Sequence, residues 1–176
     1  MSRAVFLDRD GVVNAAIVRA GRPRAPSSLR ELEIPSEVAP ALASLHARGF
    51  LLIIVTNQPD VARGSISRDS VEEIHRVLRA QLPLDAVLTC YHDDGDGCAC
   101  RKPRPGLLLQ AASTHGIDLP TSFMVGDRWR DIEAGERAGC TTVFIDHDYA
   151  EEAPRSYHHR VASLSAARDI ILSRAA

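Results

Sequence analysis

The sequence has 176 residues, of which 45% are hydrophobic and 25% are charged, as in soluble globular proteins. A formal net charge of −2 and only 5% aromatic residues exclude a broadly basic or base-stacking surface for nucleic acid. The longest apolar run, 50–55, is too short to span a bilayer, and the N-terminus lacks the long apolar region of a signal peptide. We therefore expect a cytoplasmic protein without membrane or nucleic-acid partners.

Short apolar runs rich in Val, Ile and Leu alternate with amphipathic stretches along the chain, which predicts alternating strands and helices. In chain order, we expect strands over 4–7, 51–55, 87–91, 123–125 and 142–145, separated by helices over 38–45, 71–82, 105–116 and 131–138. Ser36 and Ser67 are the expected N-caps of the first two helices, and Gly116 and Gly139 end the last two. This order predicts an α/β fold, a Rossmannoid three-layer sandwich around a parallel sheet.

Two segments interrupt the alternation. Residues 15–32 are expected to form a loop rich in arginine and proline, and residues 91–104 form an excursion rich in Gly, Asp and Cys. Long loops in a compact α/β domain are usually functional. The tail, 149–176, is expected to end in a helix that starts near Ser163. With no composition break, we expect a single domain over 1–176 with its core at about 3–146.

Polar residues follow four of the predicted strands, at the edge where parallel sheets bind ligands. They are Asp8-Arg9-Asp10-Gly11, Thr56-Asn57-Gln58, Arg101-Lys102, and Gly126-Asp127 with Asp131. Clustered carboxylates repel one another unless they share a cation, and oxygen ligands suit Mg²⁺. Lys102 is the one lysine among 21 basic residues. A lysine and a threonine beside the carboxylates would bind phosphoryl oxygens, whereas the motifs of P-loop and dinucleotide-binding proteins are absent.

Three cysteines and a histidine lie within eleven residues: Cys90, His92, Cys98 and Cys100. Three thiolates and an imidazole can form the closed tetrahedral shell of structural zinc. Such a zinc would hold the loop that leads directly to Lys102. Reduced thiols without a metal are the alternative, and Cys140 is expected to be a buried core thiol.

The four strand-end motifs, in this order, resemble motifs I to IV of the haloacid dehalogenase superfamily of phosphatases. The resemblance implies that Asp8 is the nucleophile and Asp10 the general acid and base. It also implies that Asp8, the backbone carbonyl of Asp10, and Asp127 hold Mg²⁺. Thr56 and Lys102 would bind the transferring phosphoryl group.

The zinc loop that runs into Cys100-Arg101-Lys102-Pro103 narrows this resemblance. It is similar to the D-glycero-D-manno-heptose 1,7-bisphosphate 7-phosphatase group, which includes the histidinol-phosphatase domain. The resemblance implies a monomer without a large cap domain, in which Arg101 and Arg128 contact the substrate. We also expect Asn57 and Gln58 to contact the substrate.

The expected function is therefore Mg²⁺-dependent hydrolysis of a small phosphorylated metabolite through an aspartyl-phosphate, with the 7-phosphate of the heptose bisphosphate as the leading substrate. Histidinol phosphate is the nearest alternative. A non-catalytic, zinc-stabilised binding module is a remote one, because binding phosphate needs no acid beside a nucleophile. Arg19, Arg22 and Arg24 could bind a second phosphate or form a solvated basic loop. No chemistry is assigned to the other histidines, His75 among them.

Overall fold

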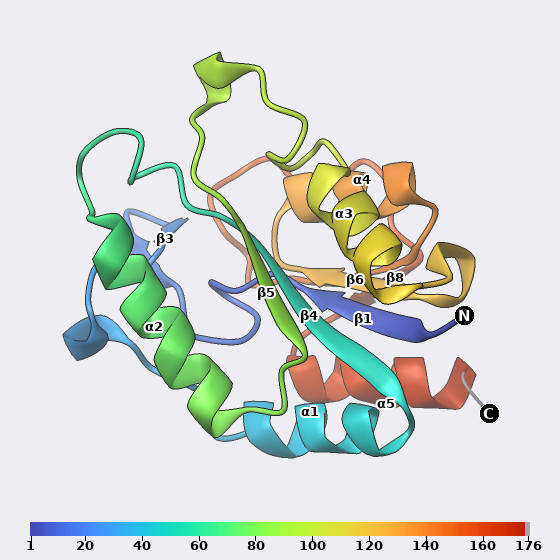
Figure 1. Ribbon diagram of the computed structural model, residues 1–176. Helices are drawn as coiled ribbons and strands as arrows, with labels where there is room; N and C mark the ends of the chain where they lie inside the picture. Colours follow the sequence, from blue (N-terminus) through green and yellow to red (C-terminus); the bar gives the residue numbers. More distant parts are fainter. Residues whose placement is uncertain (175–176) are drawn as a thin grey trace.

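The computed structural model describes residues 1–174 and shows a layered α/β fold (Figure 1). The elements follow in the order β1 (Arg3–Leu7), β2 (Ile17–Arg19), β3 (Arg22–Arg24), α1 (Val38–Ala47), β4 (Phe50–Asn57), α2 (Arg68–Gln81), β5 (Ala86–Cys90), α3 (Gly106–His115), β6 (Phe123–Gly126), α4 (Trp129–Ala138), β7 (Thr141–Ile145), β8 (His159–Val161) and α5 (Leu164–Arg174). Short 3-10 helices lie at Leu29–Glu31, Asp94–Asp96 and Leu119–Thr121.

Six strands form the central sheet in the order β5-β4-β1-β6-β7-β8, and every neighbouring pair is parallel. The predicted parallel sheet is therefore confirmed. The chain first adds strands on one side of β1 and then continues on the other, starting with β6. In such sheets the ligand lies at the carboxyl ends of the strands where the order reverses, which here are the ends of β1, β4 and β6.

Helices cover both faces of the sheet. In Figure 1, α1 and α5 lie together below the sheet, and α3 and α4 lie together above it. Successive residues of β1 point to opposite faces: Val5 and Leu7 belong to one apolar core with α1, α2 and α5, and Phe6 belongs to the other with α3 and α4. All three side chains are fully buried. Burial on both faces explains why the strands are almost continuously apolar.

The segment 15–32 contains structure that the sequence did not predict. Its strands β2 and β3 pair antiparallel through a turn at Ala20 and Gly21, both of which have a positive φ. Two-residue hairpin turns need this backbone conformation. The strands are three residues long and half exposed, and although β2 begins with Ile17 and Val18, the two arginines and one proline of β3 show no apolar pattern that would predict its partner. The strand β8 was missed for the same reason.

The helix starts differ in part from the predicted ones. Ser67 caps α2 as predicted, since its side chain accepts a hydrogen bond from the Ser70 backbone N–H. The prediction of Ser36 is wrong, because a turn between Pro35 and Val38 makes Glu37 the residue before α1. Within residues 1–174, no helix has the length and apolar character needed to cross a membrane.

Candidate active site

The catalytic candidates lie at the carboxyl ends of three adjacent strands. Asp8 follows β1, Thr56 lies near the end of β4, and Asp127 follows β6. All three side chains are buried. Parallel pairing of β1 with both β4 and β6 brings these ends to one edge of the sheet, so sequence positions more than a hundred residues apart meet there.

Lys102 joins the carboxylates from the loop that follows β5, and its side chain is buried. Its Nζ donates to Asp8 Oδ1 at 2.7 Å and to the Val55 carbonyl at 2.7 Å, and it lies 2.7 Å from Asp131 Oδ1. Burial alone would lower the pKa of Lys102, but the carboxylates of Asp131 and Asp8 outweigh it and raise that pKa. Lys102 is therefore held in its charged form. We call Asp8, Asp127, Asp131 and Lys102 the carboxylate–lysine centre.

The centre has the donors for a divalent cation. Carboxylate oxygens of Asp8, Asp127 and Asp131 all lie within 4.8 Å of one another. Both oxygens of Asp127 are buried without a hydrogen-bond partner among residues 1–174. Burial and the charge of Asp131 raise the pKa of Asp8 to about 6, and burial and the charge of Asp8 raise the pKa of Asp127 well above its usual range. A hard cation such as Mg²⁺ would balance these charges and use the free oxygens.

Two glycines make room for this arrangement. Gly11 has a φ of +93°, and a Cβ there would lie 1.9 Å from Asp127 Oδ2. A Cβ on Gly126 would lie 2.1 Å from the Cβ of Asp131. Any side chain at either position would push an acidic residue away from the centre, which explains the glycine in each of the two motifs.

Asp10 accepts several hydrogen bonds beside the centre. Arg9 donates to it through Nε at 3.0 Å and Nη2 at 2.9 Å, Asn14 donates to Oδ1 at 3.1 Å, and Gln58 donates to Oδ2 at 2.8 Å. Arg9 is fully buried. Sequence reasoning named Arg9 only as part of the first motif and did not foresee that it would hold Asp10.

The residues of the second motif point to different partners. Thr56 lies beneath the cavity floor, and its Oγ1 accepts a hydrogen bond from Gln58 at 2.9 Å. Asn57 binds the backbone of Lys102 on both sides, donating to its carbonyl and accepting from its N–H, each at 3.1 Å. Asn57 therefore positions the loop that carries Lys102, in addition to lining the cavity.

A cavity of about 300 Å³ opens over Asp8, Asp10 and Lys102. Its lining includes five arginines: Arg22, Arg24, Arg63, Arg128 and Arg130. Arg63, Arg128 and Arg130 form ion pairs with carboxylates, whereas Arg22 and Arg24 form none within residues 1–174 and suit an anionic ligand. Arg19 is not part of the lining, because the turn of the hairpin directs it elsewhere, where its charge acts on Glu31.

The two arginines expected to contact the substrate have acidic partners. Arg128 lines the cavity and forms a two-pronged ion pair with Glu151, at 2.8 and 2.7 Å. Arg101 lies outside this cavity and lines an adjoining hollow of about 120 Å³. There Arg101 Nε donates to Asp94 at 2.8 Å, and the same carboxylate pairs with Arg130 at 3.0 Å.

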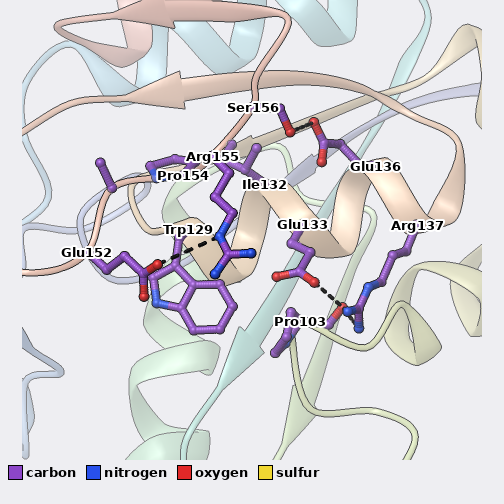
Figure 2. A pocket seen from close by; sticks show the side chains of 11 residues that line it. Pro103, Trp129, Ile132, Glu133, Glu136, Arg137, Glu152, Pro154, Arg155 and Ser156 are labelled. Atoms are coloured by element: carbon purple, nitrogen blue, oxygen red, sulfur yellow. Dashed lines mark hydrogen bonds and ion pairs between the residues drawn. The ribbon is translucent and has the colours of Figure 1, made fainter.

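A larger cavity of about 480 Å³ lies on the other side of α4 (Figure 2). Its charged side chains are paired with one another, Glu133 with Arg137 and Glu152 with Arg155, and Glu136 accepts from a serine. It contains neither the carboxylates nor the lysine of the centre. The active site is therefore identified by its carboxylates and lysine and not by the volume of its cavity.

The four residues of the predicted zinc loop converge. Cys90, Cys98 and Cys100 have sulfur atoms 3.2 to 3.7 Å apart, and His92 Nδ1 lies 3.4 Å from Cys100 Sγ and 3.6 Å from Cys90 Sγ. A tetrahedron with zinc–sulfur bonds of about 2.3 Å has edges of roughly 3.8 Å. We call these four residues the thiol cluster.

The cysteines are not joined by disulfides. Burial raises the pKa of the Cys90 thiol to about 12, and a coordinated metal ion is what converts such a thiol to a thiolate. Cys140 is buried in the core with α3 and α4, as predicted, and is not one of the four converging ligands.

Comparison with known proteins gives a consistent result. The family model described as HAD-hydrolase-like matches residues 99–167. The chain is 39% identical over 149 residues to the D-glycero-beta-D-manno-heptose-1,7-bisphosphate 7-phosphatase of Pasteurella multocida, covering 78% of each chain. It is 33% identical over 155 residues to the alpha-anomer 7-phosphatase of Photorhabdus laumondii, covering 81% of each chain.

A solved structure is similar over nearly the whole length. It is the D,D-heptose 1,7-bisphosphate phosphatase of B. bronchiseptica complexed with magnesium and phosphate. The TM-score is 0.82 at 29% sequence identity, and the alignment covers 98% of this chain and 99% of that one.

Proposed function

The chain belongs to the haloacid dehalogenase-like phosphatases, in the group of the heptose 1,7-bisphosphate 7-phosphatases, and we propose that it removes the 7-phosphate of a D-glycero-D-manno-heptose 1,7-bisphosphate. The observation that carries the proposal is the buried nucleophile candidate Asp8, hydrogen-bonded to Lys102 beside Asp127, whose oxygens have no hydrogen-bond partner within residues 1–174. A site that only bound phosphate would not need two acids, Asp8 and Asp10, at the cavity floor.

The first step transfers the phosphoryl group to the enzyme. A carboxylate oxygen of Asp8 attacks phosphorus, and a bond from phosphorus to Asp8 forms while the bond to the sugar oxygen breaks. Asp10 supplies a proton to the leaving oxygen. Lys102, which lines the cavity, binds the equatorial oxygens of the group being transferred, whereas Thr56 does not line the cavity and its Oγ1 is hydrogen-bonded to Gln58.

The second step releases inorganic phosphate. Water attacks the phosphorus of the aspartyl-phosphate, the bond to Asp8 breaks, and Asp10 takes the proton of the water. Mg²⁺, bound by Asp8, Asp127 and the backbone carbonyl of Asp10, would neutralise charge on the phosphoryl oxygens. The orphaned oxygens of Asp127 support this ligand set.

The thiol cluster is proposed to hold a structural zinc ion. Its four ligands fill a tetrahedral shell, so no position is left for water or substrate. Cys100 is two residues before Lys102, and the zinc would fix the loop that carries this lysine. Free cysteines are expected in a reducing compartment, which supports the cytoplasmic location.

The second phosphate of the substrate is proposed to bind at the rim of the cavity. Arg22 and Arg24 lie there without a carboxylate partner in the described part of the chain, unlike Arg128. Their position, on the hairpin above Asp8, supports recognition of a bisphosphate over a monophosphate. Arg19 does not line the cavity, so we do not expect it to contact the second phosphate.

The test is a phosphate-release assay on both anomers of heptose 1,7-bisphosphate, histidinol phosphate, fructose 1,6-bisphosphate and an aryl phosphate. We expect the highest kcat/KM with one heptose anomer. Replacing Arg22 and Arg24 by Ala should lower that value about 10- to 100-fold, since charge-assisted hydrogen bonds contribute roughly 1.5–3 kcal/mol. Turnover of the aryl phosphate should barely change.

Arg19→Ala is the matched control, because this arginine lies on the same hairpin but outside the cavity. Equal losses on all substrates in the double variant would contradict phosphate recognition by the hairpin. A clear preference for histidinol phosphate would replace the heptose assignment and leave the chemistry unchanged.

A further inference from the structure

A buried histidine lies behind the active site and takes no part in the steps above. His75 is on α2, at a position of the helix face that also carries Val71, Ile74 and Leu78, all of them buried. These positions form the apolar stripe that faces the core. A polar side chain on such a stripe needs a hydrogen-bond partner.

The partner of His75 is Arg9. The distance from His75 Nε2 to Arg9 Nη1 is 3.1 Å, and both side chains are almost completely buried. All guanidinium nitrogens carry hydrogen, so Arg9 is the donor and Nε2 must be the acceptor. The proton of the neutral ring is then on Nδ1, which faces Glu72 Oε2 at 3.7 Å. Burial and the charge of Arg9 lower the pKa of His75 to about 4, in keeping with a neutral ring.

Arg9 uses its remaining edge to hold Asp10. Its Nε and Nη2 donate to both oxygens of that carboxylate, at 2.9 to 3.2 Å. A guanidinium is rigid and planar, so fixing one edge on His75 fixes the direction of the other. Hydrogen bonds therefore form a relay from His75 through Arg9 to Asp10, and Glu72 faces the other nitrogen of the imidazole at the outer end of this relay.

We propose that His75 is a positioning residue for proton transfer, acting through Arg9 on the carboxylate of Asp10. The proposal rests on the proposed function above. In this structure Asp10 accepts hydrogen bonds from Arg9, Asn14 and Gln58. Asp10 also acts as an acceptor when the aspartyl-phosphate is hydrolysed, because it receives the proton of the attacking water as the bond between phosphorus and Asp8 breaks. The relay serves this second step most directly.

The test compares two substitutions at one position, assayed with magnesium. His75→Leu removes the acceptor and leaves the Arg9 guanidinium free to turn, whereas His75→Gln places an amide oxygen near the position of Nε2. We expect kcat to fall about 10- to 100-fold in His75→Leu, because small misplacements of a catalytic group can cost this much. KM should fall with kcat, so that kcat/KM changes much less than kcat, because slower hydrolysis of the phosphoenzyme does not affect the steps up to phosphoryl transfer. His75→Gln should keep kcat within about threefold.

An aryl phosphate with a good leaving group separates the two steps. Para-nitrophenolate leaves with little help from an acid, so the first turnover should stay fast in His75→Leu while hydrolysis of the phosphoenzyme slows. We expect a burst of about one para-nitrophenolate per active site, followed by a slow steady rate. Glu72 lies on the exposed side of His75. Glu72→Gln should lower the ratio of the steady rate to the burst rate by about two- to fivefold.

A merely structural role for His75 gives a different result. Burst size and steady rate would then fall together with the folded fraction, which thermal unfolding measures independently, and His75→Gln would be no better than His75→Leu. Either of these two results would overturn the inference. If His75→Leu does not fold, the burst and steady rates of Glu72→Gln provide the test instead. His46→Leu, which removes an exposed imidazole from α1, is the control. Wild-type protein that hydrolyses no phosphate ester would refute the proposed function instead.

Discussion

The carboxylate–lysine centre and the thiol cluster are two candidate metal sites built in opposite ways. The centre takes its ligands from the ends of β1 and β6 and the start of α4, and it is buried. The cluster takes all four ligands from 90–100, on a loop that is partly exposed. Three carboxylates and one lysine leave the centre with surplus negative charge and free oxygens, whereas the cluster has a complete shell.

This difference suits the carboxylate–lysine centre to catalysis and the thiol cluster to a structural role. A cation in the centre would share its coordination with a phosphoryl group and exchange readily, while an ion in the cluster would have only protein ligands. The two sites are nevertheless linked, because the chain passes from Cys100 to Lys102 within two residues. The hydroxyl of Tyr91, between two cluster ligands, also donates to Glu72 of the relay.

The most severe way to break the centre is to remove its nucleophile. Asp8→Asn preserves shape but removes the attacking charge, and turnover should fall by about 10⁴-fold or more. Steady-state phosphate release with the preferred substrate measures this. The zinc content and the circular dichroism spectrum should match those of the wild type, because the thiol cluster is untouched. Retention of a tenth of the wild-type turnover would show that the aspartyl-phosphate mechanism is wrong.

Chelation should distinguish the two metals. A mild chelator should abolish activity by removing Mg²⁺, and added Mg²⁺ should restore it fully. About one zinc per chain should remain bound through this cycle, because a closed thiolate shell holds its ion tightly. Elemental analysis before and after chelation provides the measurement. Protein purified without chelator that contains no zinc, with reactive thiols at all cysteines, would contradict the zinc assignment.

A single ligand substitution should show how the cluster supports the centre. Cys100→Ser should lower the melting temperature and reduce kcat about 10-fold, because the loop that carries Lys102 loses its anchor. Cys140→Ser is the matched control, since Cys140 is buried in the core and lies outside the cluster. It should lower stability without changing zinc content. If both variants lost zinc equally, the metal would not be held by the thiol cluster.

The smallest expected effect concerns the imidazole behind the centre. The pKa of His75 is lowered to about 4 in the folded protein, against about 6.5 when it is unfolded. The unfolded chain therefore binds an additional proton as pH falls below 6.5. Stability associated with His75 is complete above pH 6.5 and is lost as pH falls toward 4, by about 3 kcal/mol at the most.

Denaturant unfolding of the wild type and of His75→Gln over pH 4 to 7 checks this prediction. The slope of unfolding free energy against pH should be shallower in the variant, which has no group to titrate there. Identical slopes would mean that other groups cause the loss of stability at low pH.

Consecutive residues are enough to predict the parallel sheet, the strand ends that carry Asp8, Thr56 and Asp127, and the spacing of the thiol cluster. Apolar periodicity and local motifs are properties of consecutive residues, so they can be read from the chain directly. The sequence also singles out Lys102 as a functional candidate, because it is the one lysine among 21 basic residues. It missed the hairpin and β8, since strands of three half-exposed residues have no apolar pattern.

Which of these residues contact one another depends on how the helices, strands and loops pack. The burial of Arg9 against His75, the contact of Lys102 with both Asp8 and Asp131, and the exclusion of Arg19 from the cavity depend on how elements pack. A motif gives the order of residues along the chain but not the direction of their side chains. That direction follows from burial: a charge that leaves water must find a partner, and the partner comes from another part of the fold.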